Sequence, residues 1–254
     1  MVSAFGERCV AVYAIGSLAR GGFSETVSDI DLAVVLAEPL DATDAASMDV
    51  IARSAGARDT SLPNEISIFW GSIESLNGAV CGGRFPPLDR LDLIDHGLPL
   101  HGDDVRLELV RPSQRELVLA GAKFALDTLS TDDRLAQFRD PGLIADRGPI
   151  YLTKVILFPA RFLSLERIRL VAGNDESARY YCDNFDGPDA ELVAQALHWR
   201  SEALPASATI QGLLESGLVP LYERFLDVYV EAVEAYGETH VASRLMRWRN
   251  RLSI

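Results

Sequence analysis

Two acidic residues stand one residue apart in the segment SDIDL, where Asp29 and Asp31 begin an apolar run. Residues i and i+2 of a β-strand point to the same side of a sheet, so these carboxylates are expected to lie about 6–7 Å apart. Like charges beside a buried strand repel each other and lose part of their hydration. A divalent cation removes this cost, and Mg²⁺ typically takes one or two protein carboxylates together with substrate phosphates. The spacing therefore predicts that Asp29 and Asp31 bind Mg²⁺, although a lone pair of this kind is also common in turns.

A glycine–serine pair, Gly16 and Ser17, ends another apolar run about a dozen residues upstream. Glycine lets the backbone approach a phosphate closely. Ser17 offers a hydroxyl and begins a predicted short helix whose unbonded N–H groups would face an anion. Arg20 follows one turn later with a guanidinium suited to phosphate oxygens, and a surface salt bridge explains it equally well. We predict that Gly16, Ser17 and Arg20 bind a triphosphate.

A third carboxylate, Glu65, stands at the head of a later predicted strand. That strand would bring Glu65 to the same sheet edge as the aspartate pair. Three carboxylates allow either a two-metal site or one metal with Glu65 as general base. Either arrangement would activate an attacking hydroxyl and neutralise charge on a phosphate that undergoes in-line displacement.

Short apolar runs predict the strands that position these groups. The runs cover residues 9–15, 30–36 and 66–70, and they are rich in residues typical of buried strands. Residues 41–55 have an acidic start and apolar residues at helical spacing, which predicts a helix between the second and third strands.

The pattern becomes helical from about Ser113 onward. Pro159 lies inside one helical segment and is expected to kink that helix or to end a turn there. We therefore predict an α+β chain. Its N-terminal domain, residues 1–110, has a mixed sheet flanked by helices, and an all-α helical bundle occupies residues 111–254.

Composition narrows the class of partner. The formal net charge is −13, which argues against broad contact with a nucleic-acid backbone and suits a cationic small substrate. Three widely spaced cysteines indicate neither a zinc ribbon nor a disulfide framework. The N-terminus lacks the pattern of a signal peptide, and no apolar run reaches the roughly 18–20 residues of a membrane span. We expect a cytoplasmic protein that contacts no membrane; its oligomeric state stays open.

The glycine–serine pair, the DxD motif and the later carboxylate together resemble the nucleotidyltransferase superfamily with the DNA polymerase β-type catalytic fold. The resemblance covers roughly residues 8–70. It implies Mg²⁺-dependent transfer of a nucleoside monophosphate from a nucleoside triphosphate, with release of pyrophosphate. It also implies that the glycine–serine pair holds the triphosphate, that the two aspartates bind metal, and that Glu65 is a further ligand or the base.

Later segments are similar to the streptomycin/spectinomycin adenylyltransferases. They are residues 91–104, 151–154 and 173–185. This second resemblance implies transfer of AMP from ATP to a hydroxyl of an aminoglycoside, a reaction of antibiotic resistance, with the helical domain as the acceptor site. Asp146 lies near the place where that family presents an acidic group to its cationic acceptor.

Two other functions stay open. Small nucleotidyltransferases also adenylylate proteins, including paired toxins, but the long helical domain argues mildly against this alternative. The second alternative is a non-catalytic nucleotide-binding module. The complete set of three carboxylates argues against a loss of activity.

Overall fold

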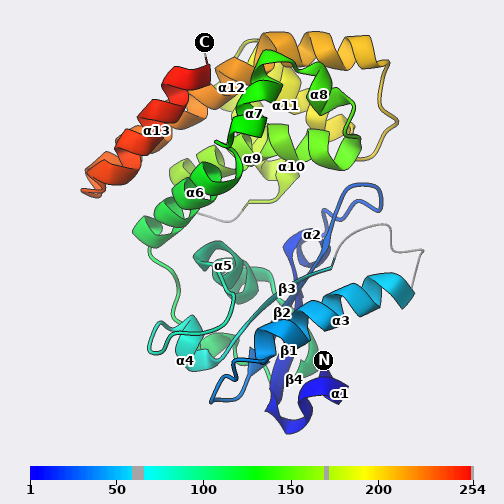
Figure 1. The fold of residues 1–254 in the computed structure, drawn as a ribbon, viewed down its shortest axis with the longest axis vertical. Helices are drawn as coiled ribbons and strands as arrows, with labels where there is room; N and C mark the ends of the chain where they lie inside the picture. The colour runs from blue at the N-terminus through cyan, green and yellow to red at the C-terminus, as the bar shows by residue number, and fades with distance from the viewer. Residues whose placement is uncertain (59–65, 169–171, 253–254) are drawn as a thin grey trace. The chain divides into compact units, whose positions relative to one another are not determined.

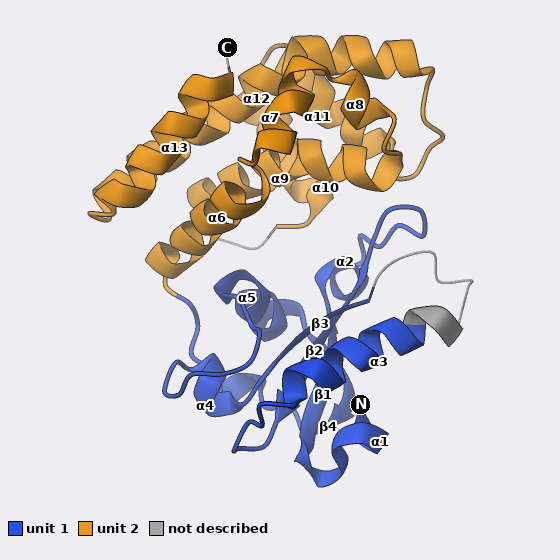
Figure 2. Cartoon of the chain, in the orientation of Figure 1, with its two compact units in different colours: residues 1–112 blue, residues 113–254 orange. Residues whose placement is uncertain are grey.

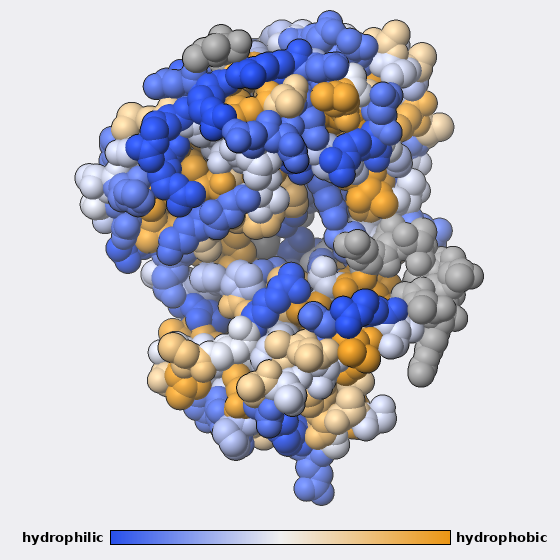
Figure 3. All heavy atoms as spheres, in the orientation of Figure 1, coloured by the Kyte–Doolittle hydropathy of each residue, from blue (hydrophilic) through white to orange (hydrophobic). Residues whose placement is uncertain are grey.

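The computed structural model describes residues 1–58, 66–168 and 172–252. The chain divides into two compact units, residues 1–112 (unit 1) and 113–254 (unit 2), shown in Figures 1 and 2. Hydrophilic residues cover much of the surface visible in Figure 3, as expected for a chain with 24% charged residues. Among the described helices, none combines the length and the apolar character that crossing a membrane requires.

Unit 1 is built on a mixed sheet. Its elements are α1 (Val2–Phe5), the short 3-10 helix η1 (Gly6–Arg8), β1 (Cys9–Ile15), α2 (Gly16–Arg20), β2 (Ile30–Leu36), α3 (Asp44–Arg58), β3 (Ile66–Gly71), α4 (Ile73–Leu76), α5 (Pro87–His96), β4 (Leu98–Gly102) and η2 (Arg106–Glu108). The four strands of this sheet follow the order β3-β2-β1-β4. β1 is antiparallel to β2 and to β4, whereas β2 and β3 are parallel. The mixed sheet confirms the predicted fold class and the three predicted strands.

The two faces of the sheet carry separate apolar clusters. On one face Val34 packs in a cluster with Met48 of α3, the helix that crosses the sheet in Figure 1. On the opposite face Ala33 packs in a cluster with Leu93 of α5. Side chains alternate between the faces along a strand, so β2 directs Asp31 to the same face as Ala33, toward α5.

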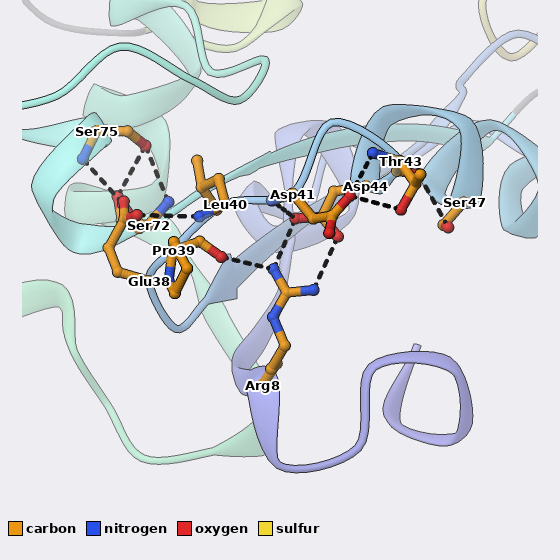
Figure 4. Close-up of polar contacts among 10 residues, drawn as sticks. All are labelled: Arg8, Glu38, Pro39, Leu40, Asp41, Thr43, Asp44, Ser47, Ser72 and Ser75. Atoms are coloured by element: carbon orange, nitrogen blue, oxygen red, sulfur yellow. Dashed lines mark hydrogen bonds and ion pairs between the residues drawn. The ribbon is translucent and has the colours of Figure 1, made fainter.

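A polar network connects η1, which directly precedes β1, to the start of α3 (Figure 4). The Arg8 guanidinium donates to both carboxylate oxygens of Asp44, at 3.0 and 2.7 Å, and to the carbonyl of Pro39 at 3.0 Å. These bonds lower the pKa of the buried Asp44 carboxyl, with the Arg8 hydrogen bond as the main cause. The Asp41 carboxylate accepts from the N–H of Thr43 at 2.7 Å, which forms a turn before the helix. The helix therefore begins at Asp44 rather than at the predicted Asp41.

Unit 2 is helical throughout its described secondary structure, as predicted. Its helices are α6 (Gln114–Thr128), α7 (Asp132–Arg139), α8 (Gly142–Ala145), α9 (Pro149–Ile168), α10 (Asn174–Asn184), α11 (Pro188–His198), α12 (Ser207–Ala235) and α13 (Thr239–Leu252). Their buried faces form the core of this unit, with large side chains such as Leu152, Tyr181, Tyr222 and Phe225 fully enclosed.

Helix α9 continues through Pro159, so the proline does not end a helical segment. A proline lacks an N–H and leaves the carbonyl four residues earlier, here that of Val155, without its helical partner. The hydroxyl of Tyr222 on α12 donates to this carbonyl at 2.7 Å inside the core. A hydrogen bond from another helix thus replaces the one that the proline removes.

Candidate active site

The turn between β1 and α2 is built around Gly16. Its backbone has a φ of +70°, a conformation that side-chain-bearing residues rarely adopt. A Cβ placed on Gly16 would also overlap the Asp31 carboxylate, standing 3.1 Å from Asp31 Cγ and 3.2 Å from its Cβ. The strand register agrees, because Ile15, the last residue of β1, lies opposite Asp31 of β2. Asp31 therefore packs directly against the turn that the sequence predicts to bind phosphate.

The aspartate pair lies where β2 begins. Asp29 immediately precedes the strand and Asp31 is its second residue; both are half-buried. The residue paired with Asp31 on β3 is Ser67, on the same face of the sheet. Two partly accessible carboxylates beside a backbone turn fit the chemistry of Mg²⁺, which takes few protein oxygens and completes its coordination with water and phosphate.

Glu65 lies outside the described residues, so its predicted convergence with the aspartates remains a prediction. Within the described part of the chain, no group of three histidine, cysteine, aspartate or glutamate side chains is arranged to hold a metal ion. The candidate metal site there consists of the two aspartates alone.

Arg20 forms a buried ion pair instead of a surface one. Its Nη1 donates to Oδ1 of Asp92, a residue of α5, and the two side chains are only 12% and 6% exposed. The other oxygen of Asp92 accepts the backbone N–H of Gly16 at 2.6 Å. Asp92 therefore contacts two of the three predicted phosphate-binding residues, although no sequence motif marks it.

The loop from α2 to β2 is closed by its own hydrogen bonds. Gly21 ends α2 with a φ of +79°. The Ser28 hydroxyl accepts the N–H of Ser24 at 2.9 Å, and the Ser28 N–H donates to the Ser24 carbonyl at 2.9 Å. Ser28 thus shapes the turn that leads into Asp29.

Asp146, the predicted acceptor-binding residue, belongs to unit 2. It directly follows α8, and its side chain is exposed. Its N–H donates to the Gly142 carbonyl at 3.1 Å. The structure thus places this carboxylate at a helix end with access to solvent.

The glycine turn, the aspartate pair and the mixed sheet that joins them are features of a nucleotidyltransferase domain. Residues 3–67 match the family model described as "Nucleotidyltransferase domain". This part of the chain is therefore a nucleotidyltransferase domain, which supports a nucleotidyltransferase enzyme.

The fold of nearly the whole chain is similar to that of a particular solved enzyme. This is the spectinomycin adenyltransferase AAD(9) from Enterococcus faecialis, in a crystal structure with ATP and spectinomycin. The match has a TM-score of 0.61 at 12% sequence identity, and it covers 99% of this chain and 94% of the other. A search of curated proteins gives no match. The structural match confirms the resemblance to this group of adenylyltransferases at the level of the fold.

Proposed function

We propose that this enzyme transfers AMP from ATP to a hydroxyl group of a small molecule and releases pyrophosphate. The observation that carries the proposal is the packing of Asp31 against Gly16, which puts a candidate metal ligand beside the candidate phosphate-binding turn. A bound triphosphate and a bound Mg²⁺ would be neighbours in such an arrangement. The similar adenyltransferase structure with ATP supports ATP as the donor.

Each residue of the proposed site has a role in this reaction. Gly16 and Ser17 hold the triphosphate, and Asp29 and Asp31 hold Mg²⁺, which when bound supplies positive charge to the phosphates. The acceptor oxygen attacks the α-phosphorus, and the bond from that phosphorus to the bridging oxygen of pyrophosphate breaks. Glu65 either takes the hydroxyl proton as general base or completes the metal site.

The proposed acceptor is an aminoglycoside-like molecule with several hydroxyl and amino groups. Two observations support this class. The similar structure contains spectinomycin, and the net charge of −13 favours the approach of a cation. We assign the catalytic domain to residues 1–110 and the acceptor-binding domain to residues 111–254, where Asp146 would contact an amino group of the acceptor.

The acceptor class is tested by incubating the protein with radiolabelled ATP and Mg²⁺. One set of reactions contains a panel of aminoglycosides that includes spectinomycin and streptomycin, and the other contains cell extract. The proposal predicts a labelled drug and equimolar pyrophosphate. Labelled protein in the extract would indicate adenylylation of a partner instead. Absence of pyrophosphate from both sets would contradict catalysis with these acceptors.

A further inference from the structure

We propose that Asp92 is a positioning residue of the nucleotide site, which sets the Gly16 turn and orients Arg20 toward the triphosphate. This inference rests on the proposed function, because it assigns Asp92 a role in the binding of MgATP. It starts from one buried carboxylate whose two oxygens hold two different groups: Oδ2 accepts the Gly16 N–H at 2.6 Å, and Oδ1 accepts from Arg20.

The contact with Gly16 fixes a peptide plane at the centre of the candidate site. A buried backbone N–H needs an acceptor, and a carboxylate oxygen is a strong one. The Gly16 N–H donates to this oxygen, and the Asp31 carboxylate occupies the place that a Cβ on Gly16 would take. A shift of Asp92 would therefore move the Gly16 turn and change the space available to Asp31.

The contact with Asp92 does not satisfy every N–H group of the Arg20 guanidinium. Nη1 pairs with Asp92, whereas the buried Nε has no hydrogen-bond partner among the described residues. A buried N–H without an acceptor is uncommon in folded proteins. Because Nε is enclosed, a triphosphate oxygen would reach it only after a shift of the Arg20 side chain. The pair with Asp92 holds the guanidinium and its positive charge beside the Gly16 turn.

A buried ion pair is weak evidence for a role in stability. Removing two charges from water costs about as much as their attraction returns. The Asp92–Arg20 pair joins α5 to α2 at the candidate phosphate-binding turn. Its location therefore favours a role in holding the geometry of the site over a role in overall stability.

Two substitutions of Asp92 distinguish the effect of its contact with Gly16 from the effect of its contact with Arg20. Asp92→Asn keeps an oxygen that can accept the Gly16 N–H and removes the charge that holds Arg20, whereas Asp92→Ala removes both. Residues that support the ligands of a metal typically contribute about 10–100-fold to metal affinity or activity, and we take the lower end of this range for Asp92. We expect the Kd for MgATP, measured by titration calorimetry without an acceptor, to rise about tenfold in Asp92→Asn and further in Asp92→Ala.

A double variant keeps the test valid if a single variant unfolds. Arg20→Gln with Asp92→Asn leaves neither buried charge unpaired. If Asp92 acts through Arg20, the double variant binds MgATP about as weakly as the weaker of the two single variants, because coupled effects are not additive. Asp95→Asn is the matched control: Asp95 also lies on α5 and pairs with Arg111 at 2.6 and 2.7 Å. It is expected to bind MgATP like the unsubstituted protein.

The outcomes distinguish this inference from the proposed function. If the unsubstituted protein does not bind MgATP, both are overturned. If it binds MgATP and the folded Asp92 variants bind equally well, with only a lower Tm, then Asp92 is purely structural and this inference alone is wrong. Tighter binding by Asp92→Asn would also overturn it, because the carboxylate would then compete with the triphosphate.

Discussion

Position 16 requires glycine for two reasons, its positive φ and the close approach of the Asp31 side chain. Gly16→Ala would force a Cβ against Asp31, whereas a Cβ on Gly21, which has a similar φ of +79°, would lie in open space. We expect Gly21→Ala to cost about 1 kcal/mol through backbone strain. Gly16→Ala is expected to cost about 1–3 kcal/mol more because of overpacking, and to weaken MgATP binding. Urea unfolding and calorimetry of both variants measure the difference. Equal effects in the two variants would show that the overlap with Asp31 adds nothing to the loss of unfolding free energy or of MgATP affinity.

The residue-level prediction depends on a local signal in the sequence. The glycine–serine pair and the two aspartates lie within 16 consecutive residues, and the antiparallel pairing of β1 with β2 places Asp31 opposite Ile15, next to Gly16. Asp92 gives no such signal. It lies 76 residues from Gly16, on a helix without a recognised motif, and only the folded structure brings the two residues into contact.

Helix α9 depends on a hydroxyl from α12. Tyr222→Phe removes the donor to the Val155 carbonyl, which Pro159 already deprives of its helical partner. We expect a loss of about 1–3 kcal/mol, the typical cost of a buried unsatisfied group. Tyr229→Phe is the matched control, because the Phe162 carbonyl that Tyr229 contacts at 3.0 Å is followed four residues later by Glu166, which has an N–H. A larger loss in Tyr229→Phe, measured by urea unfolding, would contradict this account.

The Arg8–Asp44 pair at the start of α3 makes the stability of unit 1 depend on pH. The folded-state pKa of Asp44 is lowered, mainly by the Arg8 hydrogen bond. The Arg8–Asp44 bonds therefore stabilise the fold above the unfolded-state pKa, near 3.9, and this contribution is lost as the pH falls through the folded-state pKa. Arg8→Gln is expected to lower Tm at pH 7 and to differ less from the unsubstituted protein near pH 3. The control is Arg53→Gln, an exposed arginine of α3. A difference that stays constant with pH would rule out this linkage.

The predicted elements were most accurate where apolar runs are continuous. Two of the three predicted strands have the observed bounds, Cys9–Ile15 and Ile30–Leu36. β4, Leu98–Gly102, was not predicted because it is an edge strand whose residues are all exposed, so burial imposes no alternating pattern on it. The continuation of α9 through Pro159 was also not predictable, because it depends on the distant Tyr222.

At the scale of the whole molecule, the order of the elements was sufficient to predict the fold class. Strands alternate with helices in unit 1, and helices alone follow in unit 2. This arrangement matches a solved adenyltransferase over nearly the full chain. The sequence contains less information about the acceptor, because binding of a particular small molecule depends on a few side chains that no local pattern marks. The acidic charge of the chain favours a cation without selecting one.

The central claim is that the aspartate pair supports transfer of a nucleoside monophosphate from ATP. The most direct test measures pyrophosphate release with Mg²⁺, ATP and the aminoglycoside panel in Asp29→Asn, in Asp31→Asn and in the control Asp49→Asn, an exposed aspartate of α3. The account predicts release by the unsubstituted protein and by the control, and at least about a hundredfold loss in each of the other two variants. Undiminished release in a folded Asp29→Asn or Asp31→Asn variant would contradict it.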